Sequence, residues 1–252
     1  MTTFLKYILT VVLLFSFMCL KSQSIEGKPM FLKNYGTISI PQNLDTVGQQ
    51  LVKNVIIDKI LDNADYSNES TLAKNYKIIL TKGYFTEYTK DVVVFWPSST
   101  ISYLKTFLTD PIKKIDLDKL VVLPHASFKK INSGMSSDDF QKYLFSNKDS
   151  VEKYREFMKT SYQEMIHLIF PGNVINSISV DFSSYKKKYP VIIVNIQFSF
   201  LNELNERVTL VQHVYSVFKE KNQYLAQFEY YKEDQDKWKS FISNFLIQAN
   251  LY

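Results

Sequence analysis

The stretch Val174–Tyr231, VINSISVDFSSYKKKYPVIIVNIQFSFLNELNERVTLVQHVYSVFKEKNQYLAQFEYY, decides the fold. Apolar and polar residues alternate in it over four runs, Val174–Phe182, Ile192–Phe200, Arg207–Phe218 and Tyr224–Tyr231. A period of two is typical of strands with one buried face. Because the connections are too short for a crossover helix, consecutive strands must run antiparallel. The sequence therefore predicts a four-strand meander, whose first strand points these residues to one face: Val174, Asn176, Ile178, Val180 and Phe182.

Two segments with helical spacing flank the meander. The earlier one ends at Pro171-Gly172, and its apolar positions are Val151, Tyr154, Met158, Tyr162, Met165, Ile166 and Ile169. The later one carries a single apolar stripe of Trp238, Phe241, Ile242, Phe245, Leu246 and Ala249. Only a tight turn follows Lys232, so this helix is expected to fold back over the meander. The predicted fold class is α+β: an antiparallel sheet with a C-terminal four-strand meander, packed by a long central helix and a C-terminal helix.

The N-terminal segment has the layout of a secretory leader. Lys6 is followed by Tyr7–Leu20, which carries no charge, and Lys21 closes the run. This run is shorter than the roughly 20 apolar residues that span a bilayer. We therefore expect a signal peptide over 1–22 and export to the periplasm or the exterior. A retained N-terminal segment that anchors the protein in the membrane is the alternative.

Cys19 is the only cysteine of the chain and lies inside the leader. A bacterial lipoprotein is cleaved just before such a cysteine, but small residues normally precede it, whereas Phe17 and Met18 stand here. Lipidation of Cys19 is therefore the weaker interpretation. A mature chain without cysteine has no disulfide, no thiol nucleophile and no thiolate for zinc.

The remaining elements are less regular. We expect a linker over 23–30 and a single α+β domain over 31–252, in which 97–148 has the character of an insertion. The expected strands outside the meander are Tyr35–Ile40, Tyr76–Thr81, Asp91–Trp96 and a minor one at Val121–Leu123. The expected helices are 44–62, a short one capped by Ser99, and two that start at the capping-box spacings Ser136/Asp139 and Asp149/Glu152.

Two stretches give this order of elements a resemblance to a known fold. They are YGTISIP at Tyr35–Pro41 and FKEKNQYLAQFEYYKEDQDKWKSFISNF at Phe218–Phe245. The first resembles the opening strand, and the second the final strand, acidic turn and closing helix, of the PsbP-like fold. That fold includes an extrinsic photosystem subunit and DcrB-type lipoproteins of the bacterial envelope. The resemblance extends over Phe31–Leu251, fits 97–148 poorly, and implies a binding or assembly module without implying any functional residue.

Composition excludes several classes of protein. A hydrophobic fraction of 46% excludes general disorder, and only 6 glycines argue against glycine-rich phosphate loops. The formal charge of +5 falls to +3 once Lys6 and Lys21 leave with the leader. Lys186–Lys188 is interpreted as a solvated hairpin tip, with contact to phosphate or lipid headgroups as the alternative. Arg155 and Arg207 are the only arginines among 30 basic residues, so nucleic acid is not an expected partner.

Residues with catalytic chemistry form no local motif. His125, His167 and His213 share no helix face, and no HxxxH, HExxH, GxSxG or phosphate-loop motif occurs. The close carboxylates are interpreted as helix N-terminal or surface charges: Asp116/Asp118, Asp138/Asp139 and Glu233/Asp234/Asp236. We therefore expect no catalytic residue, no cofactor and no metal ligand.

The function expected from these observations is an exported, non-enzymatic binding or assembly module of the bacterial cell envelope. Its expected partner is an envelope protein or an apolar ligand, with membrane contact only through the N-terminal segment. One alternative is a carrier that holds an apolar ligand between the sheet and the helix at 150–169. The other is an enzyme whose site is assembled from distant residues, for which the candidates are His125, His167, His213 and Asp116.

Overall fold

The computed structural model describes residues 25–46, 92–109, 124–170, 172–201 and 205–252. Several expectations from the sequence lie outside these ranges. They are the leader with Cys19, the helix beyond residue 46, the strands at Tyr76–Thr81 and Val121–Leu123, and Asp116.

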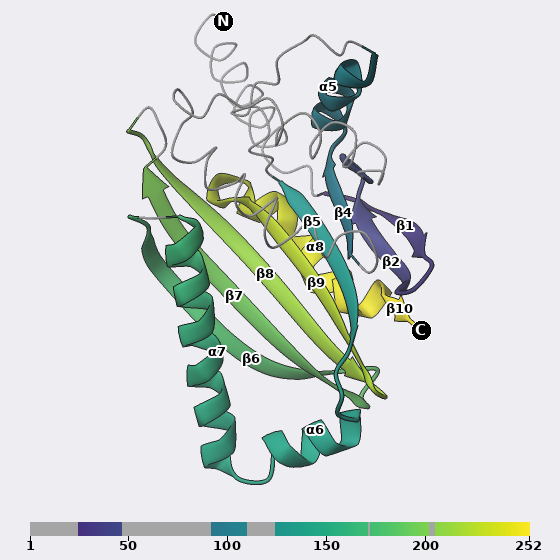
Figure 1. Cartoon of the computed structure of the whole chain (residues 1–252), viewed down its shortest axis with the longest axis vertical. Coiled ribbons are helices and arrows are strands. Elements are labelled where there is room, and N and C mark those ends of the chain that lie inside the picture. The colour runs from purple at the N-terminus through teal and green to yellow at the C-terminus, as the bar shows by residue number, and fades with distance from the viewer. Residues whose placement is uncertain (1–24, 47–91, 110–123, 171, 202–204) are drawn as a thin grey trace, which may run out of the picture.

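A long, twisted antiparallel sheet forms the body of the molecule (Figure 1). Its spatial order is β3-β4-β5-β9-β8-β7-β6, so that the predicted meander β6–β9 makes up one side and earlier strands extend it beyond β9. Every neighbouring pair in it is antiparallel. The strands are β3 (Leu44–Thr46), β4 (Val92–Pro97), β5 (His125–Asn132), β6 (Val174–Tyr185), β7 (Tyr189–Leu201), β8 (Arg207–Lys219) and β9 (Asn222–Tyr231).

The two faces of this sheet carry different elements. Helices α6 (Ser137–Leu144) and α7 (Lys148–Ile169) cover one face over β6 and β7, while α8 (Gln235–Gln248) covers the other (Figure 1). A short helix, α5 (Ser98–Thr109), follows β4, and the single turn η5 (Lys232–Asp234) leads from β9 into α8. The molecule is therefore α+β with a packed meander, as the sequence predicts.

A small second sheet lies on the α8 side. It has the order β1-β2-β10, with β1 (Gly27–Leu32), β2 (Gly36–Pro41) and β10 (Asn250–Leu251). Gly36 has a φ of +130°, and a Cβ there would lie 2.2 Å from the carbonyl oxygen of Asn250. Only glycine therefore allows β10 to approach β2 this closely.

Two hydrophobic clusters share the strands of the large sheet. Because side chains alternate along a strand, β8 supplies Val211, Tyr215 and Val217 to the α8-side cluster. The same strand supplies Leu210, Val214 and Phe218 to the α7-side cluster. The central strands are consequently buried on both faces, which explains their high content of Val, Ile, Phe and Tyr.

Helix α8 packs as its apolar stripe predicts. Trp238, Phe241 and Phe245 are buried, and the Trp238 ring stacks on Tyr230 with centroids 4.7 Å apart and an interplanar angle of 3°. The Phe245 ring lies 4.8 Å from Phe228, edge to face. The helix is therefore part of the core and ties β9 to the small sheet.

The expected linker at 23–30 is replaced by a strand from Gly27 onward. Lys28, Met30 and Leu32 alternate with outward residues and face the core side, and Met30 packs against the α8-side cluster. Gly27 and Pro29 gave the segment the appearance of a linker. Proline is tolerated here because β1 is an edge strand, whose outward N–H groups have no ladder partner.

The expected helix at 44–62 does not begin at residue 44, because Leu44–Thr46 is strand β3, paired with Phe95–Pro97 of β4. The segment 97–148, expected as an insertion, contains a central strand of the sheet. β5 lies between β4 and β9 and pairs with both. The sheet therefore extends through this segment.

Two local details also differ from expectation. Strand β6 has a bulge between Ile175 and Ser177, so Asn176 is an extra residue and Val174 becomes exposed instead of pointing inward. Helix α7 begins at Lys148, and its N-cap is Asn147, whose Oδ1 accepts a hydrogen bond from the Ser150 amide at 2.7 Å. The Asp149/Glu152 spacing therefore does not mark the start of the helix.

Replacement of Phe245 by alanine is expected to lower the free energy of unfolding by about 3–5 kcal/mol, because it leaves a cavity under the sheet. The matched control is Ile247→Ala on the same helix, where the side chain is 80% exposed and the loss should stay within about 0.5 kcal/mol. Urea denaturation of both variants measures the difference. Equal midpoints would show that α8 does not belong to the core.

Candidate functional site

The junction between α6 and α7 places aromatic side chains at the surface. Ser136 caps α6, since its Oγ accepts from the Asp139 amide at 3.1 Å and donates to Asp139 Oδ2 at 2.7 Å. This confirms the predicted start of the helix at the Ser136/Asp139 spacing. Asn147 caps α7 a few residues later. The two caps fix a tight connection, and Phe145, the C-cap of α6, lies at that corner.

We call five aromatic residues at this corner the junction patch: Tyr143, Phe145, Tyr154, Phe157 and Phe182. Tyr143, Phe145 and Phe157 are 59%, 50% and 64% exposed. The Phe145 ring lies 6.2 Å from Phe182, and Tyr154 lies 6.4 Å from Phe182 and 6.3 Å from Phe157. The patch therefore forms one connected surface and is not a set of isolated side chains.

The junction patch rests on the α7-side cluster. Phe140 of α6 stacks on Phe218 of β8 with centroids 3.9 Å apart and an interplanar angle of 13°. Its ring also contacts Tyr154 at 5.9 Å, edge to face. Burial and the neighbouring Tyr143 raise the pKa of Tyr154. The stacked Phe140–Phe218 pair thus lies beneath the junction patch and packs α6 against the sheet. The exposed rings of the patch are therefore attached to helices that the core holds in place.

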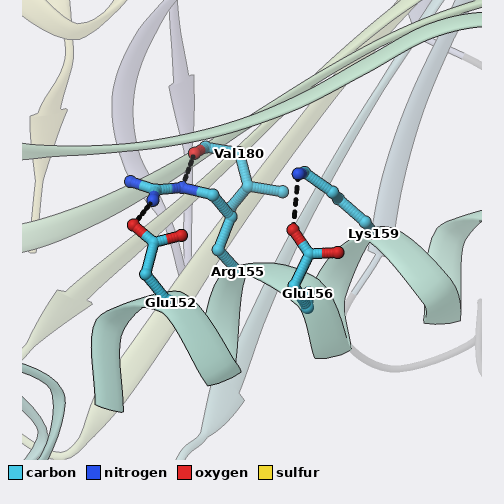
Figure 2. A network of polar contacts seen from close by, with 5 residues as sticks. All are labelled: Glu152, Arg155, Glu156, Lys159 and Val180. Atoms are coloured by element: carbon cyan, nitrogen blue, oxygen red, sulfur yellow. Dashed lines mark hydrogen bonds and ion pairs between the residues drawn. The ribbon is translucent and has the colours of Figure 1, made fainter. Parts of the chain in front are cut away.

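Arg155 connects the patch to the edge of the sheet (Figure 2). Its Nε donates to the carbonyl oxygen of Val180 at 2.9 Å, and its Nη1 pairs with Glu152. The guanidinium also lies over the Phe182 ring, 5.4 Å from the centroid. One helical turn on, Lys159 pairs with Glu156 at 2.6 Å. Because β6 is the edge strand of the sheet, Arg155 anchors α7 to that edge.

This arrangement has the composition of a protein-binding surface. Aromatic residues and arginine are enriched at the centre of protein interfaces. Contiguous exposed apolar surface on a folded domain marks a site of interaction. Since two helices and a strand hold the patch, a partner can bind it without ordering a loop.

The sequence does not predict this patch. Phe140 and Leu144 of α6 are buried, whereas Tyr143 on the same helix is exposed. Phe157 lies off the predicted apolar stripe of α7. The available signal was an aromatic residue outside the stripe, Phe157, which follows Arg155 by two positions.

His213 is held in a polar network on the α8 side. Its Nδ1 lies 2.6 Å from Asn195 Oδ1, and its Nε2 lies 2.8 Å from the Tyr230 hydroxyl. Burial lowers the pKa of His213 to about 4, so the imidazole is neutral at neutral pH. Both ring nitrogens have partners, which assigns His213 a structural role beside the Tyr230–Trp238 stack.

His125 lies on the other face of the sheet, near Glu229 of β9 and Gln212 of β8. Gln212 Nε2 donates to Glu229 Oε2 at 2.9 Å, while His125 Nδ1 is 4.0 Å from Glu229 Oε1. Desolvation by burial raises the pKa of Glu229, and His125 and Gln212 oppose that rise. The structure thus brings one histidine to a carboxylate, but both belong to neighbouring strands inside the sheet. Sequence analysis missed Glu229, a lone charge in the apolar run of β9.

The other candidates stay apart. His167 is exposed near the end of α7, and Asp138 and Asp139 lie in the first turn of α6, where they favour its dipole. Within the described ranges, no three His, Cys, Asp or Glu side chains gather in a way that could hold a metal ion. In the same ranges, no helix has both the length and the apolar character needed to cross a bilayer.

Comparison with solved structures gives a likeness of fold. The structure is similar to the solution structure of cyanobacterial PsbP (CyanoP) from Synechocystis sp. PCC 6803, with a TM-score of 0.42 and 9% identity. The likeness covers 90% of this chain and 94% of that chain. The likeness concerns the fold alone. No protein-family model and no curated protein matches the sequence.

Replacement of Glu229 by glutamine is expected to stabilise the protein at neutral pH. A carboxyl group whose folded pKa is raised destabilises the fold increasingly as pH rises above its unfolded value. The variant should therefore unfold at higher urea than the parent at about pH 7.5, and the difference should vanish near about pH 4. Glu233→Gln, at an exposed position after the same strand, is the control and should show no such dependence. A variant less stable than the parent at neutral pH would contradict the assignment.

Proposed function

We propose that this chain is an exported, non-enzymatic binding or assembly module of the bacterial cell envelope that binds a protein partner through the junction patch. The observation that carries the proposal is the connected surface of half-exposed aromatic rings beside Arg155, which is already fixed by Glu152 and Val180. An arginine held in place loses little side-chain entropy when a partner covers it. Such preorganisation favours binding over a purely solvated role.

The packing beneath the patch favours a protein partner over an apolar ligand. A carrier would need space between α7 and the meander. That interface holds the α7-side cluster, in which Ile166 and Phe170 pack with Phe198 and Phe200 of β7. Aromatic side chains that remain exposed outside this cluster are better suited to the surface of another protein.

The positions of the histidines favour a binding role over catalysis. A general base needs a free nitrogen or oxygen within reach of a substrate. His213 has both ring nitrogens occupied, and His125 and Glu229 lie within the sheet. The contacts of His213 support a structural role for that residue.

Export is the second part of the proposal and rests on the charge-free run Tyr7–Leu20. It places the module in the periplasm or outside the cell, and the finer resemblance to DcrB-type envelope lipoproteins accords with that location. The chain carries a single cysteine within the leader, so the mature domain folds without a disulfide.

Site-specific photo-crosslinking tests the binding surface. A photoreactive residue at Phe157 is expected to give an adduct of one defined mass in the producing cells, and Tyr143→Ser with Phe145→Ser should abolish it. Because these side chains are exposed, the two substitutions should change the free energy of unfolding by less than about 1 kcal/mol. The same photoreactive residue at Ile247 on α8 is the control.

Two results would contradict the binding surface. One is the same adducts from Ile247 as from Phe157, which would indicate non-specific proximity. The other is an adduct at Phe157 that survives the loss of Tyr143 and Phe145. An adduct formed by the purified chain alone would identify the partner as a second copy.

Export is checked by N-terminal sequencing of the native protein. The mature chain is expected to begin between Lys21 and Ile25 and to fractionate outside the cytoplasm. A start at Met1 or Thr2 in the soluble cytosolic fraction would contradict export and leave the binding surface to be judged by its own test.

A further inference from the structure

Lysine side chains gather at one end of the large sheet. We call this group the lysine end: Lys33, Lys130, Lys186, Lys187, Lys188, Lys219 and Lys221. The register brings them together, because the β6–β7 and β8–β9 hairpins turn at the same end (Figure 1). Asn222 at the start of β9 pairs with Asn132 at the end of β5. The tip of the β1–β2 hairpin joins them through Tyr35, whose ring lies 5.3 Å from Tyr224.

Direct contacts hold several of these lysines around β10. Lys219 Nζ donates to the carbonyl oxygen of Leu251 at 2.9 Å, and Lys186 Nζ donates to Asn250 Oδ1 at 2.9 Å. Others lie over aromatic rings: Lys188 over Tyr189, Lys219 over the same ring, and Lys130 over Tyr224, at 5.0, 6.0 and 5.2 Å. These contacts therefore hold several of the positive charges in place on a surface formed by the β1–β2, β6–β7 and β8–β9 hairpins.

Acidic side chains at this end are fewer than the lysines. They are Glu220 in the β8–β9 turn and Asp138 and Asp139 in the first turn of α6, whose start lies beside that turn because the Ser137 amide donates to the carbonyl oxygen of Glu220 at 2.6 Å. Elsewhere the chain interleaves both signs, as on α7, where Glu152 and Glu156 pair with Arg155 and Lys159. The lysine end is thus a local positive field on a molecule of nearly balanced charge.

The β6–β7 turn has a left-handed backbone at its tip. Lys186 and Lys187 have φ values of 52° and 55°, in the left-handed region. Asn-Gly is the usual sequence for two such residues in a hairpin, because a side chain with a Cβ is strained there. Glu220 in the β8–β9 turn has the same left-handed backbone, with a φ of 57°, so this conformation follows from the tight hairpins. What distinguishes the β6–β7 turn is that both of its left-handed residues are lysines, which places charge at the tip.

An exposed aromatic pair accompanies the charges. Phe31 is 59% and Tyr252 51% exposed, and their ring centroids are 5.7 Å apart. Tyr252 follows Leu251, whose carbonyl oxygen Lys219 contacts. Rings with lysines beside them are the side chains that anchor proteins at the membrane–water interface.

We propose that the lysine end docks on the surface of an anionic lipid bilayer. Lysine is a flexible point charge that suits many lipid phosphates, whereas protein recognition of acidic groups favours the planar fork of arginine, which this end lacks. The aromatic pair gives the surface an apolar component that reaches the headgroup boundary. This docking is independent of the junction patch, on α6 and α7, and of the N-terminal segment.

Vesicle partitioning tests the proposal with the full chain. The measured quantity is the ratio of partition coefficients on vesicles of equal parts phosphatidylglycerol and phosphatidylcholine and on pure phosphatidylcholine vesicles. The apolar run at 7–20 and the flanking Lys6 and Lys21 are the same in the parent and in every variant, so the comparison of their ratios isolates the lysine end. The parent ratio is expected to be well above one and to fall as salt is raised, because headgroup attraction is screened.

The variant Lys186→Asn with Lys187→Gly removes two charges and relaxes the turn. Since each lysine near an anionic surface contributes about a fivefold gain in binding, the ratio should fall by about thirtyfold. The melting temperature should stay equal or rise, which separates loss of docking from loss of fold. The control is Arg207→Gln with Lys232→Gln, which removes the same charge from the opposite ends of β8 and β9 and should leave the ratio within about twofold of the parent.

Three results would overturn the proposal. They are a parent ratio near one, an unchanged ratio in the Lys186/Lys187 variant, and an equal loss in the control. Binding of the parent to polyglutamate in solution without binding to anionic vesicles would also overturn it and assign the surface to an acidic polypeptide. None of these results depends on the junction patch, so failure here is distinguishable from failure of the proposed function.

Discussion

Burial of β8 on both faces is the constraint on which the other elements depend. A strand that packs on one side only can leave its other side to water, but here α8 and the small sheet cover one face while α6 and α7 cover the other. Phe228 of β9 shows the consequence, because its ring contacts Phe128, Phe241 and Phe245 at once. Aromatic rings fill this space with few rotatable bonds, which makes the centre of the molecule stiff.

Because the centre of the molecule is stiff and buried, surfaces that bind a partner must lie at its periphery. The two surfaces to which we assign binding lie at different margins, one at the corner of α6 and α7 and one at the hairpin tips. Arg155 at the first and Lys219 at the second each reach a backbone carbonyl, of Val180 and Leu251. In both places a positively charged side chain donates a hydrogen bond to a carbonyl oxygen at the edge of a sheet. The side chains of the proposed binding surfaces therefore also cover backbone groups at the sheet edges.

The parts of the fold with a strong period were predictable from the sequence. Alternation fixed the meander, and the stripe from Trp238 to Ala249 fixed the packing of α8, because burial on one side imposes those periods. The bulge at Asn176 was not predictable, since one extra residue changes the face of its neighbours without changing composition. β1 was missed because Gly27 and Pro29 are typical of linkers, and only its edge position makes them acceptable in a strand. The sites were harder still: Glu229 and the members of the junction patch meet only through tertiary packing, and His125 was named without its partner.

The pairing of β10 with β2 has a consequence for the order in which the molecule can be completed. β2 has β1 on one side from the start, but its second partner consists of Asn250 and Leu251, which the ribosome adds more than 200 residues later. The Tyr35 hydroxyl likewise donates a hydrogen bond to the carbonyl oxygen of Leu225 at 3.1 Å, and this bond can form only once Leu225 has been made. Contacts this distant along the chain close slowly and only after synthesis. The small sheet is therefore completed only after residues 250 and 251 have been made, so its second strand pair joins two segments from distant parts of the sequence.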